Sequence, residues 1–354
     1  MLSNILEFFD NIFLYIAGLI RHFFAWLGFN ATVTEIGMGL VYFIAIIAVC
    51  VLCALFYVIW ERKLAGYIQR RPGPNRLGPN GWFQTIADAI KLLTKEDVVP
   101  LNADRVVHLW AALLIFVPPM LSLAVIPFGR QMAALDLSIG LFYLIAVSAL
   151  STIPIFMAGW GSNNKYSLMG AMRGVSQMIS YEIPMVFSLL GVVLITGTLE
   201  MQSIVAAQNH IWFVFLQPVA FIIYLICGLA ETNRAPFDLP EGESELTAGI
   251  YTEYSGMRYA LFFLAEYCNL FVIASIGTTV FLGGWQGPFL PGWVWFLGKT
   301  FVLFSFFIFC RWTFPRIRVD QLMNFGWKFL VPISLANILI TSIVLFVFNN
   351  GLGW

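Results

Sequence analysis

The stretch GMGLVYFIAIIAVCVLCALFYVIW, residues 37–60, decides the fold class of this chain. It contains no charged residue, and as a helix it is about 36 Å long at 1.5 Å per residue, more than the roughly 30 Å of hydrocarbon in a bilayer. The whole 354-residue chain is 60% hydrophobic and only 11% charged, whereas soluble domains carry roughly 25% charged residues. The sequence therefore predicts a membrane protein.

Seven further apolar runs extend this pattern, so we expect an all-α polytopic membrane protein with eight transmembrane helices. The formal net charge is zero, and the absence of a basic field predicts no nucleic-acid partner. The seven further spans are expected at residues 109–128, 137–158, 183–199, 211–230, 259–283, 293–310 and 329–348.

The positive charges predict the orientation of these spans. Of the 19 Lys and Arg residues, all but Arg21, Arg130 and Lys299 lie in four loops between alternate spans. The positive-inside rule places such loops in the cytoplasm, or in the matrix if the protein is organellar. We expect a single membrane domain over residues 31–354, and its large cytoplasmic loops are residues 61–108, 159–182, 231–258 and 311–328.

Residues 1–30 are predicted to form a separate amphipathic helix. Polar residues recur at about a helical period among apolar and aromatic ones, and Arg21 and His22 interrupt the only apolar stretch. These features favour a helix that lies in the membrane interface, in contact with lipid, over a ninth span. The alternative, that this segment crosses the membrane, stays open.

The loop after the first span contains two features that suggest binding. Three prolines, Pro72, Pro74 and Pro79, make residues 71–81 a rigid basic turn, which suits the docking of a partner protein. The helical pattern that follows has Trp82 and Ile86 on one face and Asp88 on the other, which predicts an amphipathic helix on the cytoplasmic surface. That helix is either a plain anchor or one wall of an entrance for a lipid-soluble ligand, with Asp88 at its polar edge.

Carboxylates within or beside the spans are the strongest functional signal. Charged residues at membrane depth cost at least ~2.5 kcal/mol and are usually functional. Glu266 lies inside a span, while Glu182 and Glu231 lie at the ends of two others, at similar depth. Crowded carboxylates share protons, so we expect a buried acidic cluster on a proton path. The loop after Glu231 adds Asp238, Glu241, Glu243 and Glu245 to this cluster.

Cysteine and histidine usage predicts no metal and no redox cofactor in the chain. All five cysteines fall within apolar runs, and the Cys50–Cys53 pair lacks the second pair that a metal or iron–sulfur site needs. The three histidines form no paired arrangement across spans.

Eight ordered motifs carry a resemblance to a known family. They closely resemble the H subunit of bacterial NADH-quinone oxidoreductase (complex I), the counterpart of mitochondrial subunit 1, over about residues 61–327. The motifs are ERKLAG (61–66), RPGPNR (71–76), ADAIKL (87–92) with Lys95 and Glu96, SYE (180–182), AETNRAPFD (230–238), EGESE (241–245), EY (253–254) and RIRVDQ (316–321).

This resemblance implies a function and roles for particular residues. The family forms the quinone chamber of the membrane arm, holds no cofactor itself, and passes the effect of quinone reduction to proton channels. By motif position, Arg62, Asp88 and Arg311 resemble quinone-channel residues. The residues that resemble the family's acidic funnel are Glu182, Glu231, Glu241, Glu243, Glu245 and Glu266.

The resemblance also implies partners and a location. Quinone would be the substrate, and FMN and iron–sulfur clusters would reside in partner subunits. The partners would be quinone-site subunits of the peripheral arm together with antiporter-like and small subunits of the membrane arm. The location would be the bacterial inner membrane, or an organellar inner membrane. Two alternatives stay open: the equivalent subunit of a membrane-bound hydrogenase or formate-hydrogenlyase complex, and a proton-coupled secondary transporter.

Overall fold

The structure, a computed structural model, describes residues 12–26, 30–130 and 132–352, and the regular elements within these ranges are all helical. Within these ranges, seven helical segments are long and apolar enough to cross a membrane, which confirms the predicted all-α polytopic class. They are α3 (Ala31–Ile68), α5 (Arg105–Leu114) with α6 (Val117–Val125), α7 (Gly140–Ala149) with α8 (Thr152–Gly161), α9 (Lys165–Thr196), α14 (Gly256–Phe281), α15 (Gly292–Thr313), and α16 (Val319–Phe325) with η3 (Gly326–Leu330) and α17 (Val331–Leu352).

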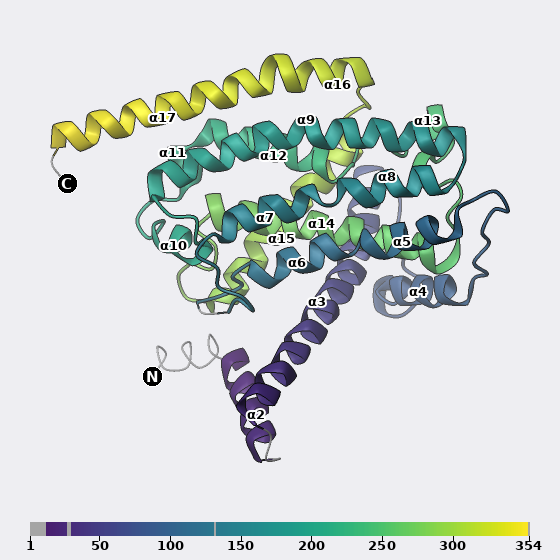
Figure 1. The fold of residues 1–354 in the computed structure, drawn as a ribbon, viewed down its shortest axis with the longest axis horizontal. Helices are drawn as coiled ribbons and strands as arrows, with labels where there is room; N and C mark the ends of the chain where they lie inside the picture. Colours follow the sequence, from purple (N-terminus) through teal and green to yellow (C-terminus); the bar gives the residue numbers. More distant parts are fainter. Residues whose placement is uncertain (1–11, 27–29, 131, 353–354) are drawn as a thin grey trace.

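Most of these helices run side by side in one bundle, and α3 is inclined to them (Figure 1). The helix α14 lies at the centre, because most of its residues are buried. The shorter elements are α2 (Ile12–Trp26), η1 (Pro79–Gly81), α4 (Gln84–Thr94), α10 (Met201–Ala206), α11 (Phe213–Leu216), α12 (Pro218–Glu231), α13 (Glu243–Leu246) and η2 (Gly249–Tyr251).

The predicted span at residues 211–230 is a broken helix rather than a continuous one. Pro218 begins α12, and its ring prevents the helical hydrogen bond that would join α11 to α12. The 14 residues of α12 make about 21 Å of helix at 1.5 Å per residue. Prolines also lie in the first turn of α6, just after the break from α5, and in the first turn of α8, just after the break from α7.

The predicted span at residues 183–199 begins too late, because α9 already starts at Lys165. The first half of α9 is rich in small and polar residues, so a search for apolar runs does not detect it. Gly170 and Gly174 allow close packing there, since an added Cβ would lie 2.6 Å from the Pro240 carbonyl oxygen or ring. Part of the expected loop at residues 159–182 is thus helical and packs against the segment after α12.

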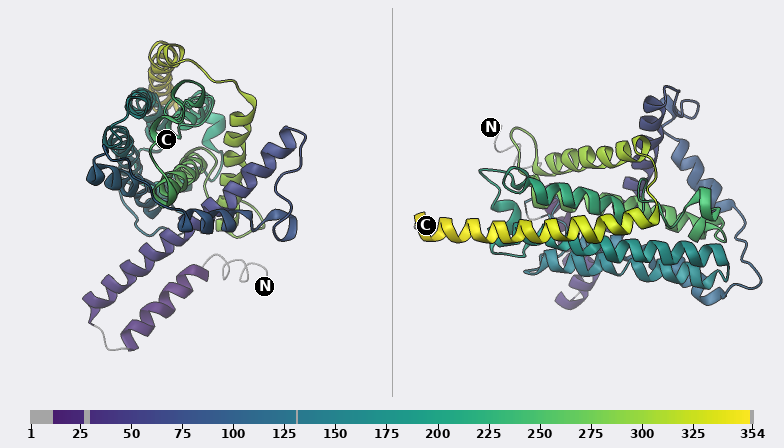
Figure 2. Two further views of the ribbon diagram at one scale, coloured as in Figure 1. Left: turned by 90° about the vertical axis from the view of Figure 1, so that its right-hand side faces the viewer. Right: turned by 90° about the horizontal axis from the view of Figure 1, so that it is seen from above.

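Two helices project from the bundle. Figure 2 shows α2 and α3 as a hairpin that extends beyond the other helices, and Arg21 on α2 pairs with Glu35 on α3 at 2.7 Å. Residues 1–11 and 27–29 lie outside the described residues, so the interfacial position of residues 1–30 stays a prediction. The sidedness of the four large loops also stays a prediction.

The predicted amphipathic helix after the first span is confirmed as α4. Ile86, Ile90 and Leu93 on its apolar face are exposed, as expected for a helix that rests on lipid. Gly81 ends the turn before it at a positive φ of 77°, and an added Cβ would lie 2.1 Å from the Pro74 carbonyl oxygen. Only glycine therefore fits where this turn folds back on itself.

Candidate functional site: a buried ionic network between two cavities

A buried arginine connects four parts of the chain. The Arg234 side chain is fully buried, and its Nη1 lies 2.7 Å from Glu61 on α3, while its Nε lies 2.8 Å from Glu266 on α14. Arg311 on α15 pairs with the second oxygen of Glu61 at 2.8 Å, and the Tyr267 hydroxyl donates to Glu61 at 2.7 Å. We call these five residues the Arg234 network. Each buried charge has an opposite partner, which offsets its desolvation.

Local structure after α12 carries Arg234 into this position. Asn233 adopts a left-handed conformation, with φ of 52°, which reverses the chain after the helix ends. Gln177 on α9 holds both sides of the turn, because its amide nitrogen donates to the carbonyls of Ala230 and Phe237 at 2.7 Å each. Burial opposes the charge of Arg234, but Glu61 and Glu266 outweigh it and hold the pKa of Arg234 well above its usual value.

The Arg234 network borders a cavity of about 550 Å³, which we call the chamber. Its volume is within the range of small-molecule sites, roughly 300–1,000 Å³. Three residues of the network, Glu61, Tyr267 and Arg311, line it, and Arg62 and the rigid turn that begins at Arg71 close other sides. The chamber therefore combines cations, an aromatic wall and a proline-locked backbone.

A second, largely apolar cavity of about 440 Å³ lies between α3, α4 and α14, and we call it the cleft. Arg62 and Phe263 line both the cleft and the chamber, so the two cavities are neighbours. Arg62 forms an ion pair with Asp88 of α4, and Asp88 lines the cleft together with other residues of α4.

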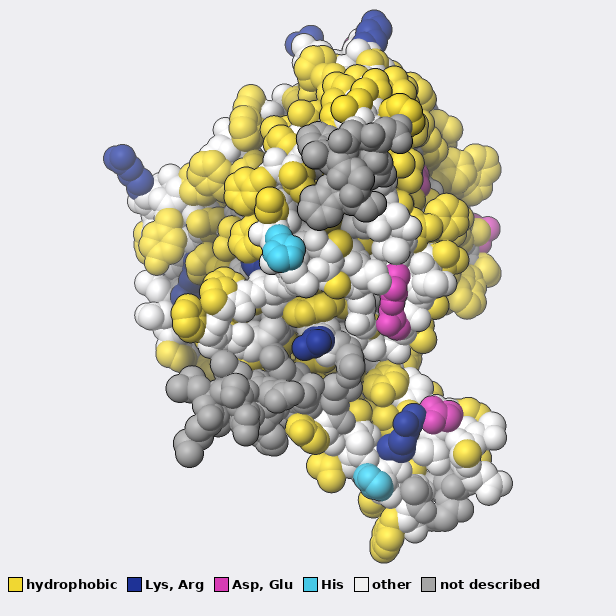
Figure 3. Space-filling model, turned by 90° about the vertical axis from the view of Figure 1, so that its left-hand side faces the viewer, with side chains coloured by type: hydrophobic (Ala, Val, Ile, Leu, Met, Phe, Trp, Pro, Cys, Tyr) yellow, Lys and Arg dark blue, Asp and Glu magenta, His cyan; other side chains and the backbone are white. Residues whose placement is uncertain are grey.

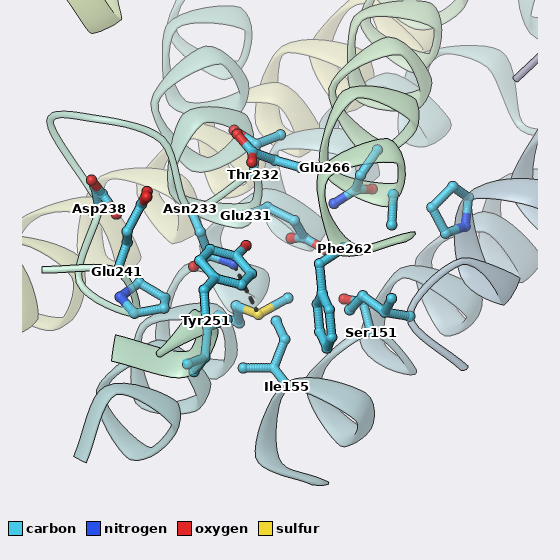
Figure 4. A pocket seen from close by; sticks show the side chains of 17 residues that line it. Ser151, Ile155, Glu231, Thr232, Asn233, Asp238, Glu241, Tyr251, Phe262 and Glu266 are labelled. Atoms are coloured by element: carbon cyan, nitrogen blue, oxygen red, sulfur yellow. Dashed lines mark hydrogen bonds between the residues drawn. The ribbon is translucent and has the colours of Figure 1, made fainter. Parts of the chain in front are cut away.

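One residue of the network, Glu266, lines a small cavity of about 50 Å³, which we call the acidic cavity (Figure 4). Four predicted carboxylates line it: Glu231, Asp238, Glu241 and Glu266. Glu231 is 3% exposed. The network thus has Glu61 in the chamber wall and Glu266 in the acidic cavity wall, and Arg234 binds both.

Asp238 illustrates the electrostatics of this cavity. Burial raises the pKa of Asp238 above its usual range, while its ion pair with Arg316 counteracts part of that rise. One of its oxygens, Oδ1, is buried without a hydrogen-bond partner among the described residues. Burial likewise keeps the pKa of the Tyr251 hydroxyl well above normal, so this hydroxyl remains a donor.

Two predicted acids lie outside the lining of the acidic cavity, and the side chain of a third is not among those that the structure describes. Glu182 is half-buried on α9 and is absent from the lining. Glu245 is exposed and pairs with Arg173 on the surface. The side chain of Glu243 lies outside the described side chains. The structure therefore assembles four of the seven predicted acids around one cavity.

Sequence reasoning missed Glu61, Arg234 and Tyr267 as site residues. Glu61 lies directly after an apolar run. The expectation that carboxylates within or beside spans are functional, which selected Glu231, applies equally to Glu61. Arg234 is one positive charge in a loop, and no local pattern marks a loop arginine as buried. In the part of the chain that the structure describes, no group of His, Cys, Asp and Glu is placed to hold a metal ion.

Fold and site together define a polytopic helical membrane protein with a buried ionic network between a chamber and an acidic cavity. A family model described as NADH dehydrogenase matches residues 40–342. The H subunit of the NADH-quinone oxidoreductase of Carboxydothermus hydrogenoformans is 49% identical over 344 residues, which cover 96% of this chain and 98% of that protein.

Two further relatives bear the same name. The H subunit of Dehalococcoides mccartyi strain CBDB1 is 53% identical over 86% of each chain. The H subunit of Bacillus cytotoxicus is 52% identical over 81% of this chain and 88% of its own length. The chain belongs to the family of NADH-quinone oxidoreductase H subunits, whose members are membrane subunits of complex I.

Proposed function

We propose that this chain forms much of the quinone-access chamber of a proton-pumping NADH-quinone oxidoreductase and couples quinone reduction to proton movement. The observation that carries the proposal is the Arg234 network, because it joins a wall of the chamber to a wall of the acidic cavity. This chain is the coupling element of the enzyme, and its own residues make or break no substrate bond.

The two larger cavities suit a quinone with a long apolar tail. The cleft offers apolar walls on α3 and α14 for the tail. The chamber offers Arg62 and Arg311 as donors for the head group and its developing negative charge, and Tyr267 as an aromatic wall beside it. Arg62 at the common wall would meet the head group as it passes from one cavity to the other.

The acidic cavity supports proton transfer after quinone reduction. Charge that develops in the chamber acts first on Glu61, which Arg234 binds together with Glu266. A change in the balance of charge between Arg234 and its two carboxylates alters the proton affinity of the neighbouring carboxylates. Each unit by which a pKa changes corresponds to about 1.36 kcal/mol. Glu231, Asp238 and Glu241 would then take up or release protons for partner subunits of the antiporter type.

Partners and location follow from this role. FMN and iron–sulfur clusters would be held by peripheral-arm subunits, whose quinone-site members would dock on the basic turn at residues 71–81. The bacterial plasma membrane is the proposed location. The names of the relatives favour complex I over the membrane-bound hydrogenase alternative, and nickel–iron hydrogenase subunits in the purified complex would reverse this preference.

The test is Glu231→Gln in the whole complex, with Glu253→Gln as the matched control. Glutamine keeps the shape of Glu231 but cannot carry a proton, so the complex should assemble while quinone reduction and proton pumping fall together by roughly tenfold or more. Glu253 lies in the same loop but binds Asn164 outside the acidic cavity, and its variant should pump normally. Wild-type pumping in Glu231→Gln would remove this residue from the path, and failed assembly would make it structural.

A further inference from the structure

A histidine in the first turn of α5 belongs to a second set of polar contacts, separate from the Arg234 network. His108 is fully buried, and its Nδ1 lies 2.8 Å from Nη1 of Arg258 on α14. A guanidinium group can only donate, so Nδ1 accepts and His108 is neutral here, with its hydrogen on Nε2. Arg258 also pairs with Asp97 at 2.8 Å, which fixes the guanidinium in place. We call these three residues the histidine clasp.

Packed aromatic rings connect the histidine clasp to the acidic cavity. The Tyr254 ring lies parallel to the His108 ring, with 3.9 Å between the centroids, and its hydroxyl donates to the His108 carbonyl at 3.2 Å. Phe262 packs edge-on against Tyr254 at 4.7 Å and against Tyr251 at 5.7 Å. Both Phe262 and Tyr251 line the acidic cavity (Figure 4). Tyr254 therefore lies between His108 and the aromatic wall of this cavity.

The charges around His108 oppose a second proton on its ring. Arg258 on α14, Asp97 after α4 and Glu253 before α14 act on the ring. The helix α8, which packs against α5, has no titratable residue over Thr152–Gly161. A proton on Nδ1 would place two cations at hydrogen-bond distance. The two carboxylates offer little relief, because each already binds a partner of its own.

We propose that His108 is a positioning residue, which holds the aromatic wall of the acidic cavity in place while it is neutral and releases that wall when it is protonated. The inference rests on the proposed function, because it concerns the cavity that would transfer protons. Arg258 repels the protonated ring, so the stack on Tyr254 loosens and Tyr251 and Phe262 lose their support. Acidification thus lowers the number of protons pumped per electron before it stops quinone reduction.

The experiment measures protons pumped per quinone reduced by the intact complex in proteoliposomes, from about pH 8 to about pH 5, where histidine changes charge. The wild type should lose at least about half of this ratio toward the acidic end, as most His108 becomes protonated. His108→Phe keeps a ring that stacks on Tyr254 but cannot be protonated, so its ratio should stay nearly constant. The matched control is His210→Phe, which should follow the wild type, because His210 is exposed between α10 and α11.

Arg258→Met tests the histidine clasp from its other side and decides the question if His108→Phe fails to assemble. It removes the repelling cation, so a protonated His108 is tolerated and the ratio should again stay nearly constant with pH. A wild-type pH profile in either assembled variant would overturn the inference. A constant ratio in the wild type over the same range would also overturn it.

Amide hydrogen exchange separates the histidine clasp from the proton path. After correction for the intrinsic effect of pH, exchange in residues 249–254 should rise severalfold toward acidic pH in the wild type and stay constant in His108→Phe. If exchange responds in this way but Glu231→Gln pumps normally at neutral pH, the proposed function fails and the clasp stands. If Glu231→Gln loses pumping while neither exchange nor coupling depends on His108, only the clasp fails.

Discussion

The two ends of the bundle satisfy buried polar groups in different ways. At the end near α4 and α13, carboxylates pair with arginines and face cavities, as in the Arg234 network. At the opposite end, Lys299 donates to the carbonyls of Leu282, Gly284 and Gln286 at 2.7, 3.1 and 2.7 Å. Figure 3, which views that opposite end, shows mostly hydrophobic and neutral side chains with few charges.

This difference separates a responsive region from a structural one. Lys299 binds backbone carbonyls that keep their charge distribution at every pH, so it fixes the end of α14 and the turn after it. Arg234 binds two carboxylates whose protonation can change, and one of them lines each cavity. In the proposed mechanism, buried charge at the first end would transmit a change in the chamber, whereas buried charge at the second end would stabilise the fold.

The largest effect is expected from Arg234→Met. It would leave Glu61 and Glu266 buried without their common partner, and removal of one member of a buried pair costs roughly 3–5 kcal/mol. The variant complex should assemble poorly, as measured by its amount and its melting temperature. Arg173→Met is the control, because its pair with the exposed Glu245 is worth about 0–1 kcal/mol. Normal assembly of Arg234→Met would contradict the importance of the network.

The next largest effect concerns the wall between the cleft and the chamber. Arg62→Ala and Asp88→Ala should each lower turnover with long-tailed quinones by roughly tenfold, about the loss of one charge-assisted hydrogen bond. Reduction of artificial acceptors by the peripheral arm should change little, because these acceptors bypass the chain. An equal loss in both assays would instead indicate that the arm docks incorrectly.

A smaller effect is expected from Glu182→Gln. Glu182 is half-buried and outside the lining of the acidic cavity, so the variant should assemble and lose turnover and pumping together, but less than Glu231→Gln. Parallel assays of quinone reduction and proton uptake in proteoliposomes measure this. A loss as large as that of Glu231→Gln would place Glu182 within the same proton-sharing group and enlarge the cluster.

The smallest effect on coupling is expected from Lys299→Met at the opposite end. Loss of its hydrogen bonds should lower the stability of the complex by about 1–3 kcal/mol, visible as a lower melting temperature. The number of protons pumped per electron should match the wild type. A reduced number of protons per electron at normal quinone turnover would show that the opposite end takes part in coupling. The distinction between the two ends of the bundle would then be wrong.

Hydropathy and charge placement predicted most of this fold, because membrane spans must be long and apolar. The break at Pro218 was missed although the proline marks it locally, whereas the early start of α9 was missed because it depends on packing against the segment after α12. For the site, the rule that intramembrane acids are functional located Glu231 and Glu266. It could not find Arg234, because the burial of a loop arginine depends on partners from α3 and α14 that are distant in sequence.

The central claim is that the acidic cavity changes its protonation when quinone is reduced in the chamber. Infrared difference spectroscopy of the intact complex, recorded on quinone reduction, tests this directly. The account predicts a carboxyl band in the wild type that persists in Glu253→Gln and disappears in Glu231→Gln. The same band in all three proteins would mean that Glu231 does not respond to the quinone, and the account would then be wrong.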